Sequence, residues 1–182
     1  MKSVDGMKNE IERDNAVRFF AEHYRSKGYH LHCHRNMEIY GVIQGAVCVN
    51  VAGIQRILTD GQVAVIDGLE NHSYEIDGRA EICYLHIGTR YSSKLYSLYP
   101  QKRLPHFLLD EEFNKRIFEQ IRAVVDNGQA MSELRRFGMV YQLFADIIDH
   151  YGMTDRTVNT GADQDIVTKV IQYIYDHYSE CS

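Results

Sequence analysis

Three histidines and a glutamate carry the chemistry that this sequence suggests. His32, His34 and Glu38 are separated by even numbers of positions, and His72 lies just after an apolar run at 62–66. Because side chains alternate between the two faces of a strand, His32, His34 and Glu38 are expected to share one face of a single strand. Imidazole nitrogens and a carboxylate suit Zn, Ni, Fe or Mn and leave coordination positions open for water or substrate.

A pocket without metal is the alternative for the same four side chains. They can form a polar floor that hydrogen-bonds a ligand, or they can hydrogen-bond one another. The spacing therefore indicates a binding site and leaves the metal open.

Further aromatic and polar residues follow the same alternation and are candidates for the walls of that pocket. Tyr40 lies two positions after Glu38, and Tyr74 lies two positions after His72. Tyr84 and His86 share a face of the last predicted strand. Aromatic walls with a few polar tips are typical of small-molecule sites. Tyr74 and Tyr84 fit equally well as core residues whose hydroxyl groups find partners nearby.

The composition is ordinary for a globular protein with a core of its own. The chain has 182 residues, of which 45% are hydrophobic and 25% charged, and its formal net charge is -5. Phosphate binding depends on Lys and Arg, so a chain with this negative net charge does not by itself predict a nucleic-acid surface. Neither a signal-peptide pattern nor a membrane-length apolar run is present. We expect a cytoplasmic protein that does not contact a membrane.

The first half of the chain has the pattern of short strands separated by glycine turns. Turn signals recur at 44–45, 60–61, 67–68 and 77–78, and apolar and polar residues alternate between them. This predicts a small barrel or sandwich. Besides the histidine strand, strands are expected at 16–24, 46–51, 54–58, 62–66, 73–76 and 80–87. A break is expected at 26–28. The segment 46–51 is predicted to return beside the histidine strand.

The second half has the pattern of helices. Asp110 and Ser132 are predicted to cap helices at 111–127 and 133–151, joined by a short turn into an antiparallel pair. Leu134 is placed on the stripe of the second helix that faces the sheet. Surplus apolar side chains predict a homodimer through residues 110–152, particularly through Val140, Leu143, Phe144 and Ile147. The alternative is that one wall of the barrel absorbs all of this apolar surface.

Three other segments complete the chain. The Tyr- and Lys/Arg-rich segment 90–103 fits a solvated connector better than a nucleic-acid contact, because the whole chain is acidic. Residues 153–164 are predicted to be a linker. Residues 165–182 are predicted to form one amphipathic helix with nothing of its own to pack against. That helix is expected to be the first element of a further, truncated domain.

The histidine cluster resembles the first cupin motif. The resemblance rests on the pattern His32-x-His34-x3-Glu38-x6-Gly45. It implies a mainly β protein: a cupin barrel, also called a double-stranded β-helix or jelly roll, over residues 1–109, followed by the antiparallel helical pair.

A second segment resembles the second cupin motif. Its pattern is Gly61-x5-Asp67-x-Leu69-x2-His72, with Asp67 where the family usually has Pro and Leu69 where it usually has Gly. The position of His72 agrees with the motif. The resemblance thus implies one metal or ligand site made by His32, His34, Glu38 and His72.

The order of the segments resembles AraC-family transcription regulators. In those proteins a cupin-like ligand-binding domain precedes a dimerising helical pair and then a helix-turn-helix DNA-binding domain. The resemblance implies a small-molecule-sensing domain whose effector is a polar metabolite such as a sugar. It implies DNA contact only through the C-terminal domain.

Two alternatives to the regulator stay open. One is a stand-alone metal-dependent cupin enzyme acting as a dioxygenase, isomerase or decarboxylase. The other is a structural dimerisation module with a filled barrel. The sequence assigns no catalytic residue, because it contains no nucleophile motif, P-loop or dinucleotide-binding glycine pattern.

Overall fold

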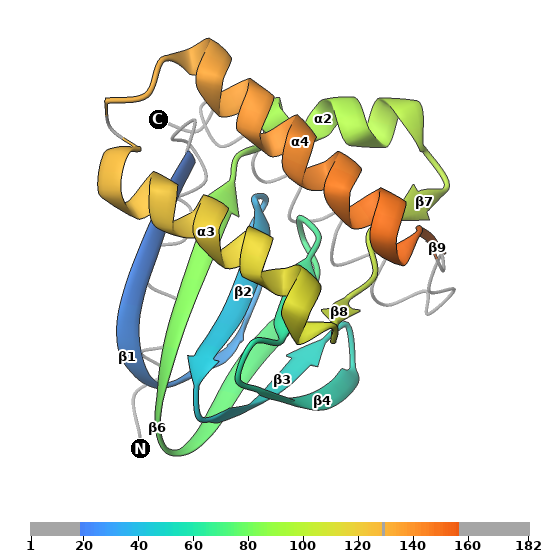
Figure 1. The fold of residues 1–182 in the computed structure, drawn as a ribbon. Helices are drawn as coiled ribbons and strands as arrows, with labels where there is room; N and C mark the ends of the chain where they lie inside the picture. The colour runs from blue at the N-terminus through green and yellow to red at the C-terminus, as the bar shows by residue number, and fades with distance from the viewer. Residues whose placement is uncertain (1–18, 129, 157–182) are drawn as a thin grey trace, which may run out of the picture.

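A strongly bent sheet of seven strands forms the body of the molecule. The computed structural model describes residues 19–128 and 130–156 (Figure 1). The order of the paired strands is β4-β3-β6-β2-β5-β8, and β1 also pairs with β6. Their bounds are β1 Phe19–His32, β2 Met37–Gln44, β3 Ala46–Val51, β4 Ile54–Thr59, β5 Val63–Ile66, β6 His72–Ile87 and β8 Phe107–Leu108.

Strand β6 is the central strand on which the others are arranged. Its first half pairs with β3, from Cys48 opposite Glu75 to Val51 opposite His72. Its second half pairs with β2, and β1 pairs along both halves. The mainly β fold expected from the sequence is therefore present as a half-barrel, and β6 joins its two parts.

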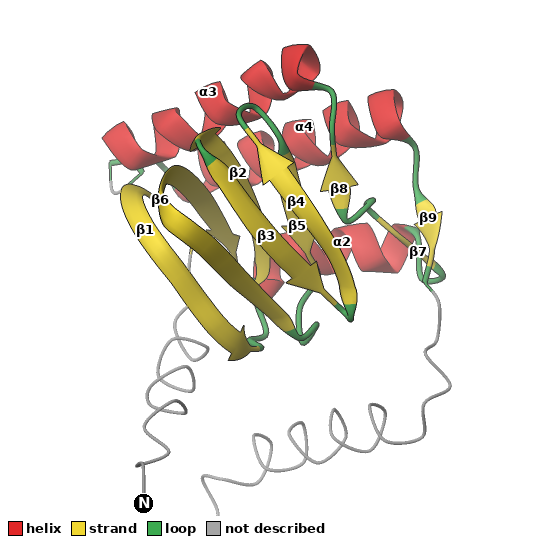
Figure 2. Cartoon of the chain, turned by 90° about the horizontal axis from the view of Figure 1, so that it is seen from below, coloured by secondary structure: helices red, strands yellow, loops and turns green. Residues whose placement is uncertain are grey.

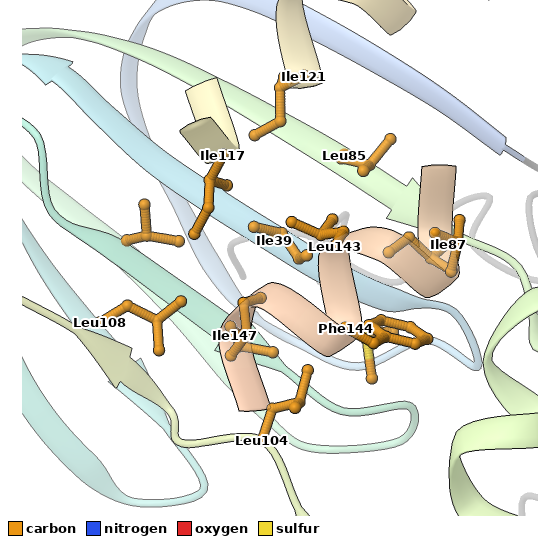
Figure 3. Close-up of a cluster of buried hydrophobic side chains, with 14 of the residues drawn as sticks. Ile39, Leu85, Ile87, Leu104, Leu108, Ile117, Ile121, Leu143, Phe144 and Ile147 are labelled. Carbon is orange, nitrogen blue, oxygen red and sulfur yellow. The ribbon is translucent and has the colours of Figure 1, made fainter. Parts of the chain in front are cut away.

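Each face of the sheet has a hydrophobic cluster of its own. The outer face packs against the helices, as Figure 3 shows for Ile117 and Ile121 of α3 (Glu111–Asn127) and for Leu143, Phe144 and Ile147 of α4 (Glu133–Tyr151). The inner face buries a second cluster, composed of Tyr40, Val42, Val47, Val49, Val51, Leu58, Ala64, Ile66, Tyr74, Ala80 and Ile82. Strand alternation separates the two sets, so Met37 and Ile39 face the helices while Glu38 and Tyr40 face inward.

Several strand boundaries differ from the predicted ones. Strand β1 does not break at 26–28, because a register shift with Gly28 at φ 109° carries the chain through as a bulge. Strand β6 likewise continues through Gly78, at φ 90°. The segment 46–51 pairs with β6 and β4 and not with β2. Turn residues indicate where the backbone can adopt a turn conformation. They do not indicate which strand will pair with which.

The prediction that one strand carries His32, His34 and Glu38 is wrong. Strand β1 ends at His32, and β2 begins at Met37. His34 lies in the connector between them. The shared face that parity predicted is produced instead by a bend between two strands.

The predicted helical pair is confirmed. Helices α3 (Glu111–Asn127) and α4 (Glu133–Tyr151) lie together on one side of the sheet (Figure 2). The Asp110 side chain accepts a hydrogen bond from the Phe113 amide, and the Ser132 side chain accepts one from the Arg135 amide. These are the N-caps expected from the sequence.

Helix α2 (Thr89–Leu98) replaces the solvated connector expected at 90–103. It buries Tyr91 and Leu95 in the outer cluster. A helix that begins without a capping side chain and mixes basic and aromatic residues has no strong local signal. The packing of α2 against the outer cluster therefore determines where this helix forms.

Helix α4 presents a different stripe to the sheet from the predicted one. Val140, Leu143, Phe144 and Ile147 are buried in the outer cluster, whereas Leu134 is 81% exposed. The four residues expected to face a second subunit are therefore part of this chain's own core.

The end of the described chain forms a short strand at a place where the sequence predicted a linker. Strand β9 (Thr154–Asp155) pairs with β7 (Lys102–Arg103) in a small sheet. The rest of the predicted linker and the predicted helix at 165–182 lie outside the described residues. Among the described residues, no helix is long and apolar enough to span a bilayer.

Candidate functional site

A buried carboxylate, that of Glu38, lies at the centre of the polar cluster on the inner face. The Nε2 atoms of His34 and His86 lie 3.1 Å and 2.9 Å from Glu38 Oε2. The Tyr74 hydroxyl donates to Glu38 Oε1 at 2.7 Å. His72 Nε2 lies 3.9 Å from Oε2. The structure thus brings together residues that are up to 52 positions apart in the chain.

The bend of β6 is what allows these groups to meet. His86, in its second half, lies opposite Glu38 of β2 in the sheet register. Tyr74, in its first half, pairs with Val49 of β3. Because β6 serves both neighbours, Tyr74 and His86 reach the same carboxylate from two directions.

Backbone carbonyl groups orient three of the histidine rings. The Nδ1 atoms of His32, His34 and His72 lie 2.8, 2.9 and 2.8 Å from the carbonyl oxygens of His30, Asn36 and Glu70. A carbonyl oxygen only accepts, so Nδ1 carries the proton in each ring. In His72 the Nε2 atom is then an acceptor that a ligand can use, since the second nitrogen of a neutral imidazole accepts. His34 Nε2 instead faces the Glu38 carboxylate.

The charges of the cluster favour an ionised Glu38 and a neutral His72. Burial opposes ionisation of Glu38, but the charge of His86 and the hydrogen bonds from His34 and His86 hold its pKa well below the usual value. Burial, together with the charges of His32 and His34, lowers the pKa of His72 to about 4 against the pull of Glu38. His72 is thus an uncharged acceptor at neutral pH.

The donor set fits a divalent metal ion. Two groups have ligand atoms within 4.8 Å of one another: His32, His34 and His72 form the first, and His34, Glu38 and His86 form the second. Within residues 19–128 and 130–156, His72 Nε2 is buried without a hydrogen-bond partner. A cation beside it would accept that lone pair.

The four predicted metal ligands do not form one compact group. Glu38 shares its group with His86, which the sequence placed in the pocket wall. The assignment of His32, His34, Glu38 and His72 as a single metal site stays a prediction.

Aromatic rings lie beside the polar cluster, while their role as walls of a ligand pocket stays a prediction. Tyr40 stacks on Tyr74 with ring centroids 4.0 Å apart and planes at 7°. Tyr84 is half-buried, and its ring centroid lies 4.9 Å from that of His86. Valine, leucine and isoleucine side chains fill the remainder of the inner face. The inner face therefore combines a polar and aromatic cluster with aliphatic side chains.

Sequence reasoning missed the groups that hold the histidines. The carbonyl groups of His30, Asn36 and Glu70 act through the backbone, so residue type gives no signal for them. The one available signal was the acidic residue two positions before His72. Glu70 is part of the loop that joins β5 to β6.

Comparison with protein families gives a match over most of the chain. The profile of the AraC-like ligand-binding domain matches residues 15–144. The chain belongs to the AraC-like ligand-binding domain family. This domain gives no match among curated proteins.

The AraC-like domain is also similar to solved cupin structures. An RmlC-like cupin from Shewanella frigidimarina is 21% identical, with 37% of this chain and 65% of that chain covered and a TM-score of 0.33. A predicted oxalate decarboxylase from Thermotoga maritima is 23% identical, with 37% and 64% covered and a TM-score of 0.35. A cupin from Bacteroides fragilis is 19% identical, with 37% and 62% covered and a TM-score of 0.32. The chain thus spans less than two thirds of each of these proteins.

Proposed function

We propose that the AraC-like domain senses a small polar molecule at the Glu38 cluster. The observation that carries the proposal is a buried carboxylate within hydrogen-bonding distance of two imidazoles and a phenol. Burying such a charge is costly unless it is well paired, so an inward-facing cluster of this kind favours a binding role.

A sugar or a related metabolite suits the chemistry of the cluster. An ionised carboxylate accepts hydrogen bonds from hydroxyl groups, and a neutral imidazole can both donate to them and accept from them. The stacked Tyr40 and Tyr74 rings adjoin them and offer the apolar contact that a small-molecule site needs. Hydroxyl groups of the ligand would replace the hydrogen-bond partners that Glu38 has within the chain.

Sensing requires a change that the rest of the protein can detect. An effector shifts a conformational equilibrium only if it binds one conformation better than the other. In the proposed regulator, that shift would alter how a helix-turn-helix domain following this chain meets DNA in the cytoplasm. The acidic charge of the present chain is consistent with DNA contact being made elsewhere.

Nuclear magnetic resonance of the histidine side chains tests the location of the site. A panel of sugars and sugar acids is added to the chain, and the imidazole signals are followed. Binding at the cluster is expected to move the signals of His34, His72 and His86. The exposed His23 and His150 serve as internal controls, and movement confined to those two would refute the proposal.

A metal-dependent cupin enzyme is the second candidate function. The observation that favours it is the convergence of imidazole Nε2 atoms, with that of His72 lacking a hydrogen-bond partner. His32, His34 and His72, or His34, Glu38 and His86, would hold the ion. The ion would supply a Lewis acid, and the Tyr74 hydroxyl would keep Glu38 oriented.

Metal content distinguishes this candidate. The chain is loaded with Zn²⁺, dialysed and assayed for bound metal beside His34→Ala. One equivalent in the wild type and a large loss in the variant support a metal centre, since His34 belongs to both ligand groups. Equal content in both proteins would refute it.

A further inference from the structure

The loop between β5 and β6 holds two histidines of the site in place. The Leu69 amide donates to the His34 carbonyl oxygen at 2.7 Å. The Glu70 carbonyl oxygen accepts from His72 Nδ1 at 2.8 Å. Adjacent residues of one loop thus contact the backbone of one candidate ligand and the side chain of another.

The loop also fits closely against the connector that carries His34. A Cβ atom at Gly68 would lie 2.3 Å from the Arg35 carbonyl oxygen. Leu69 has φ 67°, a left-handed conformation that a leucine adopts only at a cost. The surrounding contacts must over-determine this conformation, so the loop and the connector are expected to move together.

The acidic side chains of the same loop point away from the site, toward other elements. The Asp67 carboxylate accepts from the Tyr96 hydroxyl of α2 at 3.0 Å and from Arg156, at the end of β9, at 3.4 Å. The Arg156 guanidinium also lies 4.4 Å from the centre of the Tyr96 ring. Asp67 is only 5% exposed, so its carboxylate is buried at both contacts, whereas the Arg156 side chain is 39% exposed.

Glu70 makes the second set of outward contacts. Its carboxylate lies 3.0 Å from His106 Nε2 and 3.5 Å from an Arg103 side-chain nitrogen. Arg103 belongs to β7, the partner strand of β9. Both acidic residues of the loop therefore connect to the small β7–β9 sheet at which the described chain ends.

We propose that the Asp67–Glu70 loop positions His34 and His72 and links them mechanically to the end of β9. Asp67 and Glu70 are positioning residues, because they act through the histidines and not on a ligand. The loop provides a route by which occupancy of the site changes the chain at Arg156, just before the residues that follow this domain. The inference rests on the proposed function for its biological meaning, whereas the link itself is a property of the unliganded chain.

Substitution at one end and observation at the other tests the link without any ligand. Arg156→Gln removes the contact with Asp67, and Lys102→Gln removes the neighbouring exposed ion pair with Asp155 as a matched control. The Nδ1–H signals of His34 and His72 are expected to shift in Arg156→Gln and to stay in place in Lys102→Gln. Unmoved signals in Arg156→Gln, or equal shifts in both variants, would overturn the proposal.

The reverse direction has its own matched pair. His72→Gln changes the hydrogen bond to Glu70, whereas His86→Gln changes the contact with Glu38 in the same cluster. The Arg156 amide, which donates to the Gln101 carbonyl oxygen, is expected to exchange with solvent several-fold faster in His72→Gln alone. Equal exchange rates in the two variants would count against the link.

Zinc binding separates failure of the link from failure of the proposed site. If the link operates, Arg156→Gln changes the Zn²⁺ dissociation constant by about fivefold or more, because coupling between two sites is reciprocal. Zinc that binds both proteins equally would contradict the link. No zinc binding to the wild type would instead contradict the metal candidate, and the two ligand-free comparisons would still decide the link.

Discussion

Single residues in the cluster have protonation states that are set by burial and by one another. Glu38 stays ionised because His34, His86 and Tyr74 compensate for its burial. His72 stays neutral because it is buried beside two other imidazoles. The sequence named every one of these side chains, since alternation along strands is a local property. It could not give their protonation, which depends on the distances between strands that are remote in the chain.

The depressed pKa of His72 predicts a pH-dependent stability. In the unfolded chain a histidine takes up its proton near pH 6.5, whereas folded His72 does so only near pH 4. Between these values the unfolded state binds more protons, so the free energy of unfolding falls as the pH falls. For the metal-free chain, His72 contributes a loss of about 2 kcal/mol between pH 7 and pH 5.

Denaturant unfolding at a series of pH values checks this expectation. His72→Gln is expected to flatten that part of the profile. Glu38 does not mask the effect above pH 5, because a lowered carboxyl pKa costs stability only as the pH falls through the ordinary glutamate pKa of 4.5 and below it. A variant with the same slope as the wild type above pH 5 would show that another group is responsible.

The elements of the fold differ in how much of their position is local. Helices α3 and α4 were predicted with their caps because Asp110 and Ser132 bond amides three residues away. The extent of β6 and the partner of β3 were not predicted, because both depend on strand pairing across the sheet. The outward face of α4 was mistaken for the same reason: two apolar stripes fit the period, and only the sheet selects one.

Contact between β2 and α3 gives a prediction at this scale. A Cβ atom at Gly41 would lie 2.5 Å from an atom of the Phe118 ring, so Gly41→Ala must displace the ring or the helix. Overpacking of this kind destabilises a protein by about 1–3 kcal/mol. Denaturant unfolding of Gly41→Ala measures the cost.

A double-mutant cycle provides the control for that measurement. If the ring is the obstacle, adding Gly41→Ala to Phe118→Ala costs much less than adding it to the wild type. Strictly additive losses would mean that the sheet, and not the contact with α3, excludes a side chain at position 41.

At the scale of the whole molecule, sheet and helices form one structure with a shared outer cluster. Val140, Leu143, Phe144 and Ile147 of α4 lie in it beside Ile39 and Leu85 of the sheet. The predicted fold class was therefore correct. The predicted use of those four side chains in a dimer was not, since a chain buries its own apolar surface first.

A homodimer through residues 110–152 stays a prediction, and the structure changes which residues would form it. Leu134 and Tyr141 lie two turns apart on the solvent-exposed side of α4 and are 81% and 38% exposed. We expect the wild type to sediment as a dimer at micromolar concentration. Leu134→Glu should sediment as a monomer with unchanged helix content, because a charge would be buried at the contact. A monomeric wild type, or a variant that still dimerises, would contradict this placement.

The central claim is that Glu38 and its partners bind a small polar molecule inside the half-barrel. The most direct measurement is a calorimetric titration with the sugar or sugar acid that shifts the histidine resonances of the cluster. This compound is titrated into the wild type, into Glu38→Gln and into His150→Gln. We predict that Glu38→Gln weakens binding at least tenfold, about 1.4 kcal/mol, and that His150→Gln leaves it unchanged. Equal affinity of the wild type and Glu38→Gln would contradict the claim.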